Sequence, residues 1–69
     1  MSGRCDSLTP RELAVLRLVA TGLENRTIAG EMSVGVETVK AHLASVYSKL
    51  EVSGRRDAVK RAQELGILP

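Results

Sequence analysis

Few residues of this 69-residue chain could carry out chemistry, and their types suit binding better than catalysis. The chain has one Cys, Cys5, and one His, His42, which are too few for a disulfide framework or a four-ligand zinc site. We find no acid–base pair, no nucleophile with a plausible partner and no glycine-rich phosphate loop in the sequence. We therefore expect no enzymatic activity, no metal and no cofactor.

The segment VETVKAHLASVYSKL, residues 36–50, combines two faces of different chemistry. Large aliphatic residues recur at the spacing of one side of a helix, and they are Val39, Leu43, Val46 and Leu50. The other side carries only charged or small residues, namely Glu37, Lys40, Ala41, Ala44, Ser45 and Ser48. A helix that enters the DNA major groove needs such a slim face, because bulky apolar side chains would hold it away from the base edges. Lys40 can donate to guanine there, and alanine methyl groups can touch thymine methyl groups.

The residues before this segment predict how it is positioned. Asn25 is expected to cap a short second helix, and "SVG" forms a tight connection to the helix over residues 36–50. Ala29 is small where the two helices must approach closely, and Ser33 stands at the turn position where Gly is commonest. Val39, ten residues after Ala29, is expected at an interior-facing position of the third helix. This spacing predicts a helix-turn-helix.

The clearest helix start is the stretch "LTPRE". Thr9 and Glu12 have the spacing of a capping box, and Pro10 occupies the first helical position. A helix is therefore predicted over residues 10–21, ended by Gly22 in a left-handed conformation.

A fourth helix is predicted over residues 55–65, after the break "VSG", in which Ser53 is a candidate cap. Arg55 is expected to tie the start of this helix to the rest of the domain. The apolar side of the helix could serve the core or contact a second copy of the chain, and it consists of Ala58, Val59, Ala62 and Leu65.

Length and composition place the chain among small all-α domains. It has no Phe, no Trp and one Tyr, so the core must be built from aliphatic side chains and Met, which suits a small helical bundle. We expect one domain over residues 8–69, preceded by a flexible segment, residues 1–7. The predicted fold is all-α, a compact four-helix bundle with helices at about 10–21, 25–32, 36–50 and 55–65.

The distribution of charge favours a polyanionic partner. The net charge is +2, and all of the excess lies in residues 35–69, which carry six basic residues against four acidic ones. The sequence has no apolar run that could span a membrane, and its first residues lack the apolar stretch of a signal peptide. We therefore expect no membrane partner and a cytoplasmic location.

The sequence resembles the DNA-binding domain of the LuxR/GerE regulators. The resemblance runs from Leu8 to Leu68 and rests on "LTPRE", "VLRLVATGLEN", "IA", "TVKAHL" and "KL", with Val52 and Arg55. It implies a four-helix domain that binds promoter DNA, as the output domain of a bacterial transcriptional regulator, often dimerising through the last helix. The end of the chain, "VYSKLEVSGRRDAVKRAQELGIL", is most similar to the large MalT-like ATP-dependent members, in which such a domain closes a much longer polypeptide.

The resemblance also assigns roles to residues. The residues expected to read bases are Lys40, Ala41 and Ala44, with Glu37 and Ser45 on the same side of the helix. The residues expected to meet phosphate are Arg26, Thr38, Lys49 and His42. The implied partners are double-stranded promoter DNA, a second copy of the chain on that DNA, and RNA polymerase. Two residues depart from the family pattern: Gly35 stands where a Ser cap is usual, and Ala44 stands where several members have a long polar or basic side chain.

Two other interpretations remain open. A promoter-reading domain of a sigma factor also resembles "LTPRE", "IA" and "TVK", but the predicted helix after "KLEV" counts against it. A protein-interaction module on a helix-turn-helix scaffold would fit the near-neutral first half and the bare surface at Ala41 and Ala44. Affinity for duplex DNA at low salt separates these hypotheses, because a pure interaction module should show none.

Overall fold

The computed structural model describes residues 8–69, so the segment predicted to be flexible, residues 1–7 with Cys5, lies outside the described residues. Within residues 8–69 the elements are α2 (Pro10–Ala20), α3 (Asn25–Met32), α4 (Val36–Leu50) and α5 (Arg55–Glu64), and this part of the chain contains no strand. The prediction of an all-α four-helix domain is confirmed. Helices α2 and α5 each end one residue earlier than expected.

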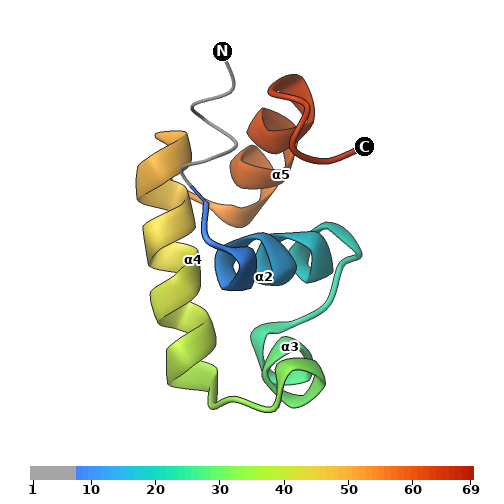
Figure 1. Cartoon of the computed structure of the whole chain (residues 1–69), viewed down its shortest axis with the longest axis vertical. Coiled ribbons are helices and arrows are strands. Elements are labelled where there is room, and N and C mark those ends of the chain that lie inside the picture. The colour runs from blue at the N-terminus through green and yellow to red at the C-terminus, as the bar shows by residue number, and fades with distance from the viewer. Residues whose placement is uncertain (1–7) are drawn as a thin grey trace.

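Helix α2 crosses the middle of the molecule, with α4 along one side and with α5 and α3 on opposite sides of it (Figure 1). One core cluster joins α2 to α5 and the second half of α4, and it consists of Leu8, Leu16, Val46, Leu50, Ala58, Ala62 and Leu68. A second cluster joins α2 to α3 and the first half of α4, and it consists of Val15, Val19, Ile28, Ala29, Val39 and Leu43. Because full burial of an aliphatic side chain contributes roughly 1.5–3 kcal/mol, these two clusters fix α4 along its whole apolar side.

The start of α2 is the capping box that the sequence predicts. The Thr9 backbone N–H donates to Glu12 Oε1 at 2.9 Å, and the Glu12 backbone N–H donates to Thr9 Oγ1 at 3.1 Å. Gly22 has a φ of +89°, the left-handed conformation expected where the chain leaves this helix. Both ends of α2 are therefore set by local sequence.

The turn between α3 and α4 has the geometry of a helix-turn-helix connection. Ser33 adopts the left-handed conformation, with φ 57° and ψ 43°, at the position where Gly is commonest. The Val34 N–H bonds back to the Ala29 carbonyl at 3.0 Å, and Gly35 is the N-cap of α4. This turn directs the chain from α3 into α4 within three residues.

Two predicted caps are wrong. Asn25 is the first residue of α3 rather than its cap, and the N-cap is Glu24, which makes no side-chain capping bond. Helix α5 begins after Gly54, so Ser53 does not cap it. The physical reason at Asn25 is that its amide oxygen accepts a hydrogen bond from Arg55, at the start of a distant helix, at 2.7 Å.

Among the described residues, no helix has both the length and the apolar character needed to cross a bilayer.

Candidate nucleic-acid interface

One side of α4 forms an open ridge, which we define as Glu37, Lys40, Ala41, Ala44 and Ser48. All five residues are exposed, while Val39 and Val46 on the opposite side have no exposed surface. The expectation of a slim, unobstructed face is confirmed. Because Ala41 and Ala44 project so little, a partner can approach the backbone of α4 closely.

The charged side chains of the open ridge are free to reorient. Lys40 Nζ lies 3.7 Å from Glu37 Oε2, one turn away on the same helix. These side chains are 59% and 90% exposed, so water screens their attraction. Lys40 can therefore leave Glu37 for a nucleic-acid base at little cost.

Arg55 holds the starts of α3 and α5 together beside the ridge. Its Nη1 donates to Asn25 Oδ1 at 2.7 Å and its Nη2 donates to the Leu23 carbonyl at 2.5 Å. This is the structural role that the sequence predicts for Arg55. The same side chain helps line a hollow next to the ridge, which Lys40 and Ala44 border from the other side.

Ser45 does not belong to the open ridge. Its hydroxyl is half-buried and donates to Glu12 Oε2 at 2.6 Å. Lys49, one turn further along α4, also bonds to this carboxylate, with Nζ 2.7 Å from Glu12 Oε1. We call Glu12, Ser45 and Lys49 the Glu12 clamp. Two residues assigned to DNA contact from the sequence thus have a partner inside the domain.

The carboxylate at the centre of the Glu12 clamp is ionised although it is 6% exposed. Burial by itself would raise the pKa of Glu12. Hydrogen bonds from Lys49, Ser45 and the Thr9 backbone, together with the positive charge of Lys49, outweigh this effect and lower the pKa from 4.5 to about 2. Sequence reasoning missed this role because Glu12 already had a local explanation as a capping residue.

The other predicted phosphate residues lie on different elements. Thr38 and His42 occupy consecutive turns of α4, where Thr38 is exposed and His42 is half-buried. Arg26 is exposed in the first turn of α3. These three polar side chains therefore come from two helices, α3 and α4.

Comparison with known proteins assigns the chain to a family. Residues 6–62 match the family described as "Bacterial regulatory proteins, luxR family". The chain belongs to this family. The luxR-family domain is a non-enzymatic helix-turn-helix module that binds DNA, with α4 as its recognition helix.

A solved structure supports the luxR-family assignment. The domain resembles the response regulator ChrA of a heme-sensing two-component system, with a TM-score of 0.86 and 36% sequence identity. The match covers 88% of this chain and 30% of the ChrA chain. This luxR-family chain therefore spans less than a third of the length of ChrA.

The luxR-family domain does not expose all the residues predicted for dimerisation. Ala58 and Ala62 are fully buried in the core cluster that contains Leu16 and Val46, so they have no surface with which to meet a second copy. Val59 and Leu65 are half-buried. The prediction assigned buried and accessible residues of α5 to the same surface, because an alanine on a helix is compatible with either a buried or an exposed position.

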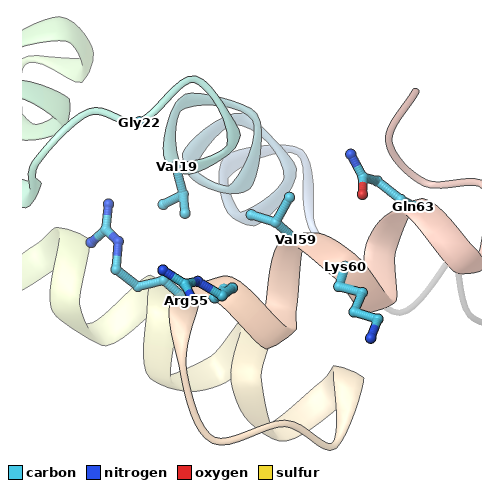
Figure 2. Close-up of a pocket in the computed structure, with 7 residues that line it drawn as sticks. Val19, Gly22, Arg55, Val59, Lys60 and Gln63 are labelled. Atoms are coloured by element: carbon cyan, nitrogen blue, oxygen red, sulfur yellow. The ribbon is translucent and has the colours of Figure 1, made fainter.

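A hollow separates the end of α2 from α5 in this luxR-family domain. Its lining combines two valines with polar and basic side chains, and it consists of Val19, Gly22, Arg55, Arg56, Val59, Lys60 and Gln63. Figure 2 shows Val19 and Val59 pointing toward one another across it, with Arg55 at one end and Gln63 at the other. Val59 is thus the apolar part of α5 that remains accessible from outside.

Proposed function

We propose that the domain reads DNA sequence by placing the first half of α4 in the major groove. Lys40 would donate to a guanine edge, Ala41 and Ala44 would contact thymine methyl groups, and Glu37 would accept from a cytosine amino group. The observation that carries this proposal is the exposure of the whole open ridge on a helix whose other side is buried. Since Ala44 offers no hydrogen bond, DNA shape contributes to recognition as well.

Phosphate contacts would orient the domain on the duplex. Arg26 in α3, with Thr38 and His42 in α4, would meet the DNA backbone. Lys49 was expected in this group from the sequence, and its bond to Glu12 gives it a competing partner.

We further propose that two copies bind neighbouring half-sites. Val59 on α5 and Leu65 just after it are half-buried, and they are the residues of the predicted set that a second copy could reach. RNA polymerase is the partner that a promoter-bound domain would contact next.

The domain would serve as the output part of a longer bacterial regulator in the cytoplasm. The sequence of residues 46–68 supports a MalT-like, ATP-dependent parent. The likeness to ChrA supports a second candidate, a response-regulator parent. The protein sequence encoded upstream of this domain decides between them, because the first parent carries an ATP-binding segment and the second carries a receiver domain.

Titration of the 69-residue protein into a fluorescent random duplex at low salt tests DNA binding directly. Competition with a duplex selected from a random pool then measures sequence preference. A protein-interaction module on the same scaffold would bind neither duplex, and that result would refute the proposal.

A further inference from the structure

We propose that Glu12 withholds Lys49 from DNA, so that this cation of the recognition helix makes no net contribution to phosphate binding. The inference rests on the DNA binding proposed above. It makes Glu12, in α2, a positioning residue for α4 and a determinant of how strongly binding depends on salt.

The contacts of the Glu12 clamp leave little freedom to Lys49. Glu12 Oε1 accepts from the Thr9 N–H at 2.9 Å and from Lys49 Nζ at 2.7 Å, while Oε2 accepts from Ser45 at 2.6 Å. The side chain of Glu12 is 8% exposed and that of Lys49 is 32% exposed. The carboxylate therefore accepts three hydrogen bonds inside the domain, and Lys49 supplies its counter-charge.

Moving Lys49 to a phosphate would carry a free-energy cost that Lys40, the cation of the open ridge, does not face. A buried carboxylate that loses its cation is left poorly solvated, whereas a phosphate on the DNA surface keeps its water and its counterions. Lys40 differs, because its partner Glu37 is 90% exposed and regains water when the lysine leaves. Lys40 is thus available to DNA, and Lys49 stays with Glu12.

An ion pair inside the domain has no net charge with which to attract the phosphates of DNA. Each lysine that neutralises a phosphate releases condensed counterions and steepens the fall of affinity with salt by about 0.9 in a plot of log K against log salt. Lys49 in the Glu12 clamp neutralises no phosphate, so it releases no counterions from the DNA. Removal of the negative partner alone should free one cation, whereas removal of both partners should change nothing.

Three proteins test this on a random 24-base-pair duplex, with affinity measured at several salt concentrations. Relative to the parent, Glu12→Gln should steepen the slope by about 0.9, which means about 3- to 4-fold more loss of affinity between 50 and 200 mM salt. The double variant Glu12→Gln/Lys49→Met keeps the same net charge as the parent and should reproduce the parent slope. Circular dichroism confirms that each variant is folded before its slope is used.

The outcomes separate the possible roles of these residues. A shallower slope for the double variant, by about 0.9, would show that Lys49 contacts phosphate in the parent and would overturn the inference. An unchanged slope for Glu12→Gln would reduce Glu12 to a purely structural residue and would overturn it too. Failure of the parent itself to bind DNA would instead refute the proposed function.

A second measurement uses the unmodified protein and does not depend on how variants fold. Acylation of lysines, quantified by mass spectrometry with and without the duplex, reports which amines the DNA covers. We expect DNA to protect Lys40 and to leave the reactivity of Lys49 unchanged. Protection of Lys49 would contradict the inference even if Glu12→Gln could not be prepared.

Discussion

At the scale of single residues, the distinction that matters is between cations that are free and cations that are already paired. Lys40 sits on the open ridge beside an exposed acid, and Lys49 bonds to a buried one. The two lysines lie on the same helix and would look equivalent in any count of charge. If Glu12 withholds Lys49 as we propose, the two lysines act differently toward a polyanion.

Lys40→Ala tests the base-reading role. If Lys40 makes a bidentate contact to guanine, the variant should lose about 1–3 kcal/mol of binding to a selected preferred duplex and much less to random DNA. Fluorescence titrations with both duplexes measure the difference. The matched control is Lys60→Ala, an exposed lysine on α5, which should weaken binding to the two duplexes equally. Equal losses for Lys40→Ala as well would remove Lys40 from the base-reading set.

Glu12 makes the stability of the domain depend on pH in the acid range. Because the pKa of Glu12 is about 2 in the folded protein and 4.5 ordinarily, its contribution is fully present above pH 4.5 and is lost as the pH falls through about 2. A shift of this size corresponds to about 3 kcal/mol. Urea unfolding at pH 7, 4 and 2.5 should show a steep decline for the parent protein.

Glu12→Gln should be less stable than the parent at pH 7 and should decline less between pH 4.5 and 2, since the amide does not titrate. Glu37→Gln is the control, because Glu37 is 90% exposed and should leave the pH profile unchanged. If Glu12→Gln and the parent lose stability in parallel over this range, another carboxylate must account for the decline.

At the scale of elements, the position of α3 depends on a contact from the far end of the chain. Arg55 bonds to Asn25 and to the Leu23 carbonyl, so the start of α5 fixes the start of the helix that precedes the turn. The turn itself, with Ser33 in the left-handed conformation, then sets the angle at which α4 leaves. The start of α4 is therefore positioned by residues that lie outside α4.

Arg55→Ala should lower the free energy of unfolding by about 1.5–3 kcal/mol, because hydrogen bonds that involve a charged group are lost and the Asn25 amide is left without its partner. Arg56→Ala provides a matched control next to it: Arg56 is exposed, and its loss should change stability by no more than about 0.5 kcal/mol. Chemical denaturation of the two variants measures both values. Similar effects at the two positions would mean that the arginine contacts are not what holds α3.

At the scale of the whole molecule, the open ridge is a surface of five residues on a chain that spans less than a third of the length of ChrA. A single ridge of five residues can contact only a few base pairs. Recognition of a promoter by such a domain therefore requires more than one bound copy. For this reason we expect a second copy on an adjacent half-site.

The spacing of half-sites tests this arrangement. Two copies of the preferred site, with centres one helical turn apart, about 10 base pairs, should bind two domains cooperatively. Insertion of five base pairs places the second site on the opposite side of the duplex and should abolish cooperativity. Val59→Glu, at a half-buried position of α5, should do the same without changing affinity for a single site, once circular dichroism has shown that the variant is folded. Cooperativity that survives both changes would show that α5 is not the contact between copies.

The sequence by itself determines the four helices and which side of α4 is buried. The capping box at Thr9, the left-handed Gly22 and the spacing from Val39 to Leu50 act within a few residues, so their consequences follow from local geometry. The open ridge was predictable for the same reason, because it is the opposite side of a helix whose apolar stripe is evident.

Only the tertiary structure decided where polar and small side chains find their partners. Ser45 and Lys49 meet Glu12 from 33 and 37 residues away, and Arg55 meets Asn25 from 30 residues away. Ala58 and Ala62 became core residues for the same reason, since burial depends on which helix packs against them. Periodicity carries no information about such pairings, because a hydrogen bond or a packing contact needs two surfaces and a sequence pattern describes one surface at a time.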